Sequence, residues 1–478
     1  MSATENRQEI SKGIARFAAE MTYDKVPVDI RKQIKDLIMD TVGCTLAAQI
    51  EESSDILIDS FYDEIAADRG CSIFGYGFKS NNTAMAAMIN ATLGHTTELD
   101  DECLTGPLHA AVVVIPTALA LGQKYNLPGR DIIAACLAGY EVSIHIGKAI
   151  HEGLYLAGWH PTGVLGVFAS AATAGNLLKL NEEQMVHALG IAYSQAAGNR
   201  EWKANGAWSK RLQAGYPNFH GITAAMLAKN GYTGASTFVE GTYGFLNDYS
   251  CQRKYPVKDE LVLKGLGEEF DIRGNLIKPY ASCRYPHAVI DSTMKLVTEY
   301  DLTPGDIKAI RIGVGENALI SCATPLERKL KPQNRVDAQF NLPYASALVI
   351  HQRKAFLEEF GPKYFTNPEI LKTVSKVTCY KDEECDALAK KGGTTGTGGA
   401  IVEIEANDGR VVRERTIYPK GDPENPFTPK ELVEKYREMA KYGLSQDRIN
   451  ASIELFERFD TLENISELCE LLEGEPKR

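Results

Sequence analysis

The chain has 478 residues, of which 44% are hydrophobic and 24% charged, a composition typical of soluble globular proteins. This length exceeds what one simple core holds, so we expect two domains, with three as the alternative. The formal net charge of −11 argues against a nucleic-acid-binding protein, which needs a basic surface. It leaves room for a local basic pocket that binds an anionic substrate.

The ten cysteines are scattered, form no CxxC pair and lie mostly in apolar runs. This usage is typical of buried free thiols in a reducing compartment and disfavours a zinc cage or a disulfide framework. The N-terminal residues are polar and lack the apolar stretch of a secretory signal, and no apolar run reaches the length of a membrane span. We therefore expect a cytoplasmic protein.

The first part of the chain predicts helices. Apolar residues recur at helical spacing in 8–50, and an Asn cap precedes an Ala- and Met-rich helix within 81–94. A short extended piece with turn glycines is expected at 71–77. Further helices are expected near 53–67, 129–151, 181–197 and 219–231.

The pattern changes near residue 272. Alternating or β-branched residues predict strands at 308–315, 376–380, 400–406 and 411–418. An Asp-Gly turn in 406–410 joins the last two strands as a hairpin. A helical segment is expected at 338–353, and amphipathic helices return after residue 428. We expect a helical domain at 1–271, an α+β domain at 272–420, and helices at 421–478 that return to the first domain.

The densest chemistry lies between His95 and Ala120. Four acids follow the histidine, then a loop, then His109 and twelve nearly uninterrupted apolar residues; the acids are Glu98, Asp100, Asp101 and Glu102. We interpret this as a buried helix that begins at a histidine, a position that aims the imidazole into the interior and alters its proton affinity. The alternative is an acidic loop on a solvated face, which the following apolar run disfavours.

Three other places repeat parts of this pattern. His160 precedes Pro161, which suits the first position of a second buried helix. Lys210 and Arg211 precede a small-residue turn and could hold carboxylates, although a basic helix end explains them as well. The third place, 277–292, lies at the predicted domain boundary, where ligand pockets are common; it contains Lys278, Arg284 and His287.

A metal site is an alternative reading of the same residues. His95, Asp100 or Asp101, His109 and His160 are of the types that hold hydrolytic metals. No strict metal-binding spacing such as HExxH is present. A metal-dependent hydrolase on a helical scaffold therefore stays as a remote alternative.

Six stretches, in order, resemble the MmgE/PrpD family. They are DLIMDTVGCTLAA, HTTELDD with the following His109, WHPTGVLGVFASAATAG, SKRLQAG with a later GYTGA, KPYASCRYPHAVIDS, and FNLPYASAL. The family includes 2-methylcitrate dehydratase, cis-aconitate decarboxylase and an iminodisuccinate epimerase. The resemblance implies a mainly α fold, with a large all-helical domain built from both chain ends and a smaller inserted α+β lid. It also implies an active site between domain and lid, a homodimer, and no metal or organic cofactor.

The resemblance also assigns positions. It matches family positions to Glu98, His109, His160, Lys210, Lys278 and His287. With the chemistry of the residues added, we expect catalytic roles for Glu98, Asp100, His109, His160, Lys210 and Lys278, and substrate-binding roles for Glu102, Arg211, Arg284 and His287. Lyase members read Asp-Phe-Asp-Asp-Thr where this chain has Glu98 to Glu102, and the spacing to His109 is one residue longer here. A carboxylate in place of the threonine changes which substrate group is tolerated.

The named activities all pass through a carbanion-like or enol-like state beside a carboxylate. Such a state needs cations for the carboxylates and an acid–base group such as imidazole. We expect a cofactor-independent lyase on a di- or tricarboxylate, with dehydration of the 2-methylcitrate type first. Decarboxylation or epimerisation in the same site is the alternative within the family. A non-catalytic carboxylate-binding paralogue is a further alternative.

Overall fold

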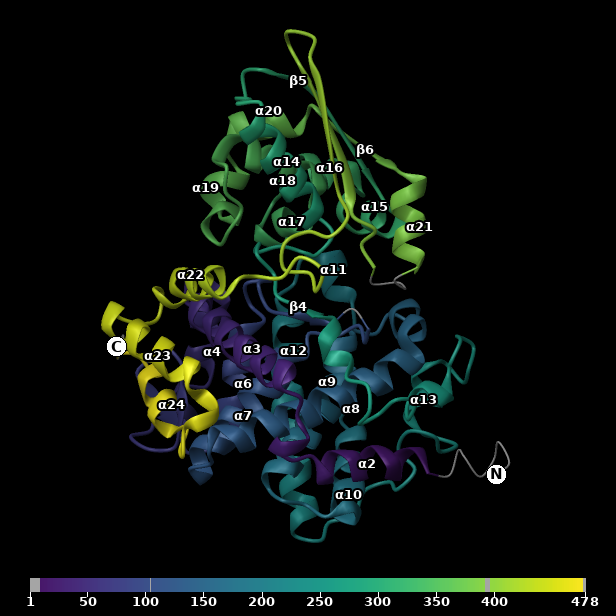
Figure 1. Ribbon diagram of the computed structural model, residues 1–478, viewed down its shortest axis with the longest axis vertical. Coiled ribbons are helices and arrows are strands. Elements are labelled where there is room, and N and C mark those ends of the chain that lie inside the picture. The colour runs from purple at the N-terminus through teal and green to yellow at the C-terminus, as the bar shows by residue number, and fades with distance from the viewer. Residues whose placement is uncertain (1–8, 104, 392–395, 476–478) are drawn as a thin grey trace. The chain divides into compact units, whose positions relative to one another are not determined.

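The computed structural model describes residues 9–103, 105–391 and 396–475. The chain divides into two compact units. Unit 1 contains residues 1–96, 100–275 and 428–478, and unit 2 contains 97–99 and 276–427. Unit 2 is therefore inserted into the sequence of unit 1, whose two long segments come from both ends of the chain (Figure 1).

Unit 1 is built mainly of helices. Its first part contains α2 (Ile10–Glu20), α3 (Val28–Ala47), α4 (Glu52–Ser60), α5 (Tyr62–Ile65), α6 (Thr83–Gly94), α7 (Ala111–Tyr125), α8 (Gly129–Leu156), α9 (Pro161–Leu177), α10 (Glu182–Tyr193), α11 (Glu201–Asn205), α12 (Ser209–Lys229) and α13 (Phe245–Tyr249). Short 3-10 turns lie at Tyr23–Lys25, Ala48–Ile50, Asp259–Leu261 and Asp271–Gly274. The strands β1 (Cys71–Ile73) and β2 (Phe78–Ser80) pair antiparallel, and β3 (Glu102–Cys103) and β4 (Asn275–Leu276) are two-residue pieces.

The core of unit 1 is formed by α6, α7, α8, α9 and α12, which pack against one another. Every residue of α9 is buried, which its Ala- and Gly-rich sequence allows. Glycines at two crossings leave no room for a side chain. A Cβ on Gly139 of α8 would lie 2.8 Å from the Ala169 carbonyl oxygen, and one on Gly221 of α12 would lie 2.6 Å from the Ala171 nitrogen. Close packing therefore fixes the positions of the helix ends that carry the polar residues described below.

The C-terminal helices return to unit 1. They are α22 (Pro429–Ala440), α23 (Gln446–Glu457) and α24 (Ser466–Leu472), with a 3-10 turn at Phe459–Thr461. In Figure 1 these yellow helices lie beside the purple α3, and α22 packs on α3. Lys435 of α22 donates to the Asp40 carboxylate of α3 at 2.5 Å, and both side chains are buried.

Unit 2 contains a four-stranded sheet of order β6-β5-β7-β8. The strands are β5 (Ile307–Val314), β6 (Val377–Lys381), β7 (Ala400–Ala406) and β8 (Val411–Thr416). β5 runs parallel to β6 and antiparallel to β7, with Ile310 opposite both Val377 and Ile404. The β7–β8 hairpin turns at Asp408–Gly409, where Gly409 has φ of 89°.

Unit 2 also contains helices, some of which pack on this sheet. They are α14 (His287–Glu299), α15 (Glu316–Cys322), α16 (Leu326–Leu330), α17 (Arg335–Gln339), α18 (Leu342–Gln352), α19 (Pro362–Phe365), α20 (Pro368–Val374) and α21 (Glu383–Lys391), with a 3-10 turn at Glu358–Phe360. α14 packs on β7 and β8 and also on α18. The core of unit 2 therefore lies between the sheet and α14.

The mainly α fold class is confirmed, and the four strands and the hairpin lie where their sequence pattern predicts them. Unit 1 is not wholly helical, because it contains the β1–β2 pair. Unit 2 spans 276–427 where the sequence pattern places a domain at 272–420. The Asp271–Gly274 turn belongs to unit 1 because the Glu141 carboxylate of α8 accepts the backbone N–H groups of Asp271 and Ile272 at 3.1 and 3.0 Å.

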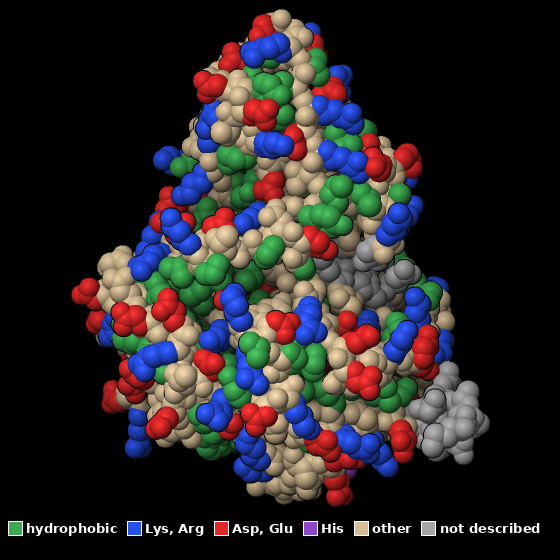
Figure 2. Space-filling view, in the orientation of Figure 1, with side chains coloured by type: hydrophobic (Ala, Val, Ile, Leu, Met, Phe, Trp, Pro, Cys, Tyr) green, Lys and Arg blue, Asp and Glu red, His purple; other side chains and the backbone are tan. Residues whose placement is uncertain are grey.

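One helix segment, Gly129–Ile150 of α8, is long and apolar enough to span a membrane by length and composition, although the sequence analysis expects no such run. Its most apolar window is 94% buried, as in the core helix of a globular unit. All ten cysteines are free, and seven are buried. On the face shown in Figure 2, acidic and basic side chains are interspersed, and the described residues there form no large basic area.

Candidate active site

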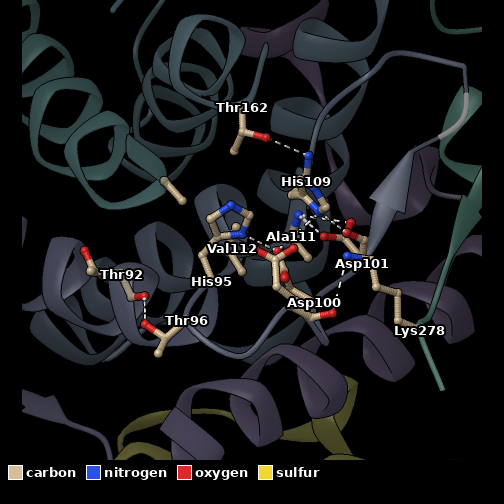
Figure 3. A network of polar contacts seen from close by, with 12 residues as sticks. Thr92, His95, Thr96, Asp100, Asp101, His109, Ala111, Val112, Thr162 and Lys278 are labelled. Atoms are coloured by element: carbon tan, nitrogen blue, oxygen red, sulfur yellow. Dashed lines mark hydrogen bonds and ion pairs between the residues drawn. The ribbon is translucent and has the colours of Figure 1, made fainter. Parts of the chain in front are cut away.

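Asp100 lies between two imidazole rings in unit 1. Its Oδ2 is 2.6 Å from Nδ1 of His95 and 3.3 Å from Nδ1 of His109 (Figure 3). The Asp100 and His95 side chains are fully buried, and the two rings are 4.9 Å apart at their centroids. A buried carboxylate in this position orients both rings.

The local sequence explains how His95 reaches this position. Asn82 caps α6, with its side-chain oxygen accepting from the N–H groups of Ala84 and Met85. The helix ends at Gly94, and His95 is its C-cap. The chain then leaves the helix, so that His95 and Asp100 face each other across a turn of five residues.

Asp101 connects the next helix to this group. Both of its carboxylate oxygens accept from the Ala111 N–H at the start of α7, at 3.1 Å, and Asn275 Nδ2 donates to it at 2.8 Å. Burial, followed by the charge of Asp100, raises the pKa of Asp101 well above its ordinary value. Asp101 thus accepts a backbone N–H group at the start of the buried helix α7, a group that has no partner within the helix itself.

The backbone of Asp101 also determines the tautomer of His109. Its carbonyl oxygen lies 2.5 Å from Nδ1 of His109. A carbonyl oxygen only accepts, so Nδ1 carries the proton and the neutral ring has its lone pair on Nε2. The His109 backbone N–H donates to Thr162 Oγ1 of α9 at 3.1 Å. α7 begins at Ala111, two residues after the histidine expected to open it.

His160 lies at the start of α9, as its place before Pro161 predicts. Its Nδ1 is 2.9 Å from Oε1 of Gln213, and its ring is stacked 6.0 Å from that of His95. The Trp202 ring meets His160 edge-on at 5.7 Å, and Lys210 Nζ lies 5.4 Å from the Trp202 ring centroid. Unit 1 therefore brings together three imidazoles, Asp100 and the buried Lys210.

Arg211 contacts other residues of unit 1. Its Nη2 lies 3.1 Å from the Glu51 carboxylate, and Nη1 donates to the Ser53 hydroxyl. Both charged side chains are buried, so the pair ties the start of α12 to the start of α4. Glu102, in β3, is half-buried.

Unit 2 contains a second set of the residues singled out from the sequence. Lys278 is 1% exposed, and its Nζ lies 3.5 Å from the backbone oxygen of Glu98. Glu98 is itself buried and has φ of 59°, a left-handed conformation that few non-glycine residues adopt. The neighbouring Thr97 carbonyl accepts from Gln339 Nε2 at 3.1 Å, which helps to hold this strained turn.

Arg284 and His287 lie at the start of α14. Arg284 is 4% exposed and pairs through Nη2 with Asp422, while its Nε and Nη1 have no hydrogen-bond partner among the residues that the structure describes. His287 is fully buried; its Nε2 is 3.4 Å from the Ser282 carbonyl oxygen. Arg284 thus offers two buried donors to a carboxylate.

Tyr280 lies beside this pair in unit 2. Its ring is 5.3 Å from that of His287, and its hydroxyl donates to Asp291. Burial raises the pKa of both Tyr280 and Asp291. Neither Tyr280 nor Asp291 is among the site residues predicted from the sequence.

Sequence reasoning also missed partners in unit 1. It treated His95 only as a possible metal ligand, and it did not identify Gln213, Trp202 or Asn275. One local signal existed: Gln213 follows Lys210 by three residues, which places both on one face of α12. The other contacts depend on tertiary packing.

Among the residues that the structure describes, two groups of side chains have the composition and spacing of a metal site. The first is His95, Asp100 and His109, and the second is Glu141, His145 and Asp271. In the first, Nδ1 of His109 donates its proton to a carbonyl and cannot ligate a cation at the same time. In the second, Lys148 Nζ already lies 2.6 Å from Asp271. Both arrangements favour proton and ion-pair chemistry over metal binding.

Comparison with known proteins agrees with the motifs in the sequence. The MmgE/PrpD N-terminal domain matches residues 12–258, and the MmgE/PrpD C-terminal domain matches 280–461. The cis-aconitate decarboxylase of Aspergillus terreus is 30% identical over 97% of this chain and 96% of its own length. The cis-aconitate decarboxylase-like protein oryM of Aspergillus oryzae is 28% identical over 99% and 100%, respectively. The cis-aconitate decarboxylase of Homo sapiens is 25% identical over 92% and 89%. The chain therefore belongs to the MmgE/PrpD family and is a lyase of that family.

Proposed function

We propose that the protein decarboxylates cis-aconitate, or a closely related unsaturated tricarboxylate, without a metal or organic cofactor. The observation that carries this proposal is the group of three imidazoles: His95 and His109 contact Asp100, and the His160 ring stacks on that of His95. The sequence alone favours dehydration of the 2-methylcitrate type as the reaction. Decarboxylation takes its place because relatives over nearly the full chain are cis-aconitate decarboxylases.

The reaction requires a proton donor and cations. The bond between the methylene carbon and its carboxylate breaks and releases carbon dioxide. Its electron pair forms a double bond to the central carbon, and the original double-bond pair moves to the former vinylic carbon. That carbon then takes one proton. The remaining carboxylate beside it carries the developing charge, which cations stabilise.

Each residue has a role in this scheme. Lys210, Lys278 and Arg284 bind substrate carboxylates, with Arg284 offering the two guanidinium nitrogens that Asp422 leaves available, Nε and Nη1. His109 or His160 delivers the proton, because imidazole changes charge near neutral pH. Asp100 orients His109 and His95.

Four further residues contribute to the proposed site in different ways. Glu98 is the second acid–base group. His287 and Glu102 limit which substrate groups are accepted. Arg211 holds α12 to α4 through Glu51, instead of binding the substrate as its residue type and position suggest.

Dehydration of a 2-methylcitrate-like hydroxy acid is the second candidate. It is favoured by the presence of several imidazoles in one cluster, since elimination of water needs a base for the carbon-bound proton and an acid for the departing hydroxyl. The difference between the two reactions lies in which substrate bond breaks.

Steady-state assays on a matched panel test the proposal. Purified protein treated with EDTA is given cis-aconitate, 2-methylcitrate, citrate and iminodisuccinate in parallel. We expect kcat/KM for cis-aconitate to exceed the others by at least about 100-fold, a difference of about 2.7 kcal/mol in transition-state binding. Preferential loss of water from 2-methylcitrate would support the second candidate, and activity that requires added metal would contradict both.

We further propose that the protein is a cytoplasmic homodimer. Its ten free cysteines suit a reducing compartment. The exposed apolar side chains of α12 suit coverage by a second copy; they include Tyr216, Met226 and Leu227. Light scattering during gel filtration tests the dimer, and a mass of 52.4 kDa would contradict it.

A further inference from the structure

We infer that Gln213 is a positioning residue that fixes which ring nitrogen of His160 carries the proton. Its Oε1 lies 2.9 Å from Nδ1 of His160. Gln213 is on α12, three residues after Lys210, and α12 packs extensively on α9, which begins beside His160. This inference rests on the proposed role of His160 in proton transfer.

The chemistry of the amide determines the tautomer. An amide oxygen only accepts, so Nδ1 of His160 donates and the neutral ring has its lone pair on Nε2. The amide is also neutral, so it orients the ring without favouring the imidazolium as a carboxylate would. His109 differs in this respect, because its Nδ1 also lies 3.3 Å from the Asp100 carboxylate.

The backbone of His160 is held independently of Gln213. The His160 N–H donates to the Gly198 carbonyl at 3.2 Å, and the Arg200 N–H donates to the Gly158 carbonyl at 3.1 Å. Gly198 has φ of 147°, and a Cβ there would lie 3.3 Å from Gln213 Oε1. The chain therefore fixes the backbone through the 158–160 and 198–200 segments, and Gln213 adds control of the ring.

Two titratable groups of the described residues lie near His160, and they come from different elements. His95, at the end of α6, stacks on its ring at 6.0 Å. Lys210, on α12, contacts the Trp202 ring, which in turn meets His160 edge-on. A negative charge introduced at position 213 would replace the amide oxygen that now lies 2.9 Å from Nδ1, so it should act directly on the titration of His160.

Long-range ¹H–¹⁵N NMR of histidine-labelled protein tests the inference without substrate. The His160 signals are identified by their loss in His160→Gln. We expect the Nδ1–H pattern in the wild type and a shift toward the Nε2–H pattern in Gln213→Leu. In Gln213→Glu the Nδ1–H pattern should persist, and the midpoint of the His160 titration should rise by about one pH unit.

Kinetics on cis-aconitate give the second readout. Gln213→Leu should lower kcat by about 10-fold with KM changed less than about twofold, as expected for a lost orienting hydrogen bond. Gln213→Glu should move the His160 limb of the pH–rate profile upward by the same amount as the NMR midpoint. The matched controls are Gln446→Leu and Gln446→Glu, since Gln446 is exposed at the start of α23 and donates to Asn450.

An Nε2–H pattern in the wild type would overturn the inference, as would a Gln213→Leu variant with unchanged tautomer and titration midpoint. If Gln213→Leu has a lowered Tm, Gln213→Glu provides the test, because it keeps the hydrogen bond. A rise in the midpoint of the His160 titration in Gln213→Glu supports the inference, and an unchanged or lower midpoint contradicts it. Protein with the Nδ1–H pattern but no activity on cis-aconitate would contradict the proposed function and leave the assignment of the tautomer intact.

Discussion

The carboxylate of Asp100 lies 2.6 Å from Nδ1 of His95, and both side chains are fully buried. The same oxygen is 3.3 Å from Nδ1 of His109. One carboxylate therefore orients two rings, and this gives the cluster its fixed geometry (Figure 3). The following predictions separate the residues that perform the chemistry from those that hold the fold.

Asp100→Asn should lower kcat by about 10- to 100-fold, the usual effect of removing a group that orients a catalytic imidazole. Steady-state kinetics on cis-aconitate measure this loss. Asp36→Asn is the matched control, because Asp36 pairs with Lys32 at the surface of α3 and should leave kcat unchanged. An Asp100→Asn variant with wild-type kcat would remove Asp100 from the proposed mechanism.

His160→Ala should abolish turnover with little change in Tm. His145→Ala should do the opposite: His145 is buried in α8, and its Nδ1 donates to the Val262 carbonyl at 2.9 Å. Loss of that bond should reduce the free energy of unfolding by about 1–3 kcal/mol while kcat is retained. Calorimetry and kinetics on both variants give the comparison. A large loss of Tm in His160→Ala would instead indicate a core histidine.

Asp101→Asn should change how stability depends on pH. Burial and the charge of Asp100 raise the folded-state pKa of Asp101 well above its value in the unfolded chain, about 3.9. The bound proton therefore favours the folded state; this stabilisation is complete below about pH 4 and is lost as pH rises through the folded-state pKa. The difference in Tm between Asp101→Asn and the wild type should therefore be more favourable to the variant at pH 8 than at pH 4. A difference in Tm that stays constant with pH would contradict this.

Lys435→Met should destabilise the protein by about 3–5 kcal/mol, because it leaves the charge of Asp40 buried without its Lys435 partner. The double variant Lys435→Met, Asp40→Leu should recover most of this loss. Urea denaturation measures both. If the double variant is no more stable than the single one, the buried charge is not the cause.

Arg284→Lys should raise KM for cis-aconitate by about 10-fold or more, because one ammonium group cannot hold Asp422 and also replace the two donors that Arg284 has available, Nε and Nη1. Arg211→Lys should leave KM within about twofold and lower Tm, since Arg211 contacts Glu51 and Ser53. Both variants replace the guanidinium group of a buried arginine by an ammonium group. A raised KM in Arg211→Lys alone would reverse the roles assigned to them.

The sequence predicts elements that depend on local signals. The Asn82 cap, Pro161 after His160, and the Asp408–Gly409 hairpin each follow from one or two residues, and all lie where expected. The parallel partner of β5 is harder to predict, because β6 joins it only after several intervening helices.

Residue types and spacing in the sequence select candidate site residues, but they do not predict which of these residues contact one another. Nothing about a glutamate at position 98 predicts the left-handed backbone conformation that this residue adopts. The contact of Arg211 with Glu51 joins residues 160 positions apart. The contact of Gln213 with His160 needs α12 packed on α9. Such pairings arise from tertiary packing, which residue types and spacing do not specify.

The central claim is most directly tested by proton NMR of cis-aconitate in heavy water with EDTA-treated protein. We expect equimolar carbon dioxide and a dicarboxylic product that carries one deuterium at the former vinylic carbon, with catalysis lost in His160→Ala. Unchanged cis-aconitate, or turnover that appears only after metal is added, would contradict cofactor-independent decarboxylation by these imidazoles.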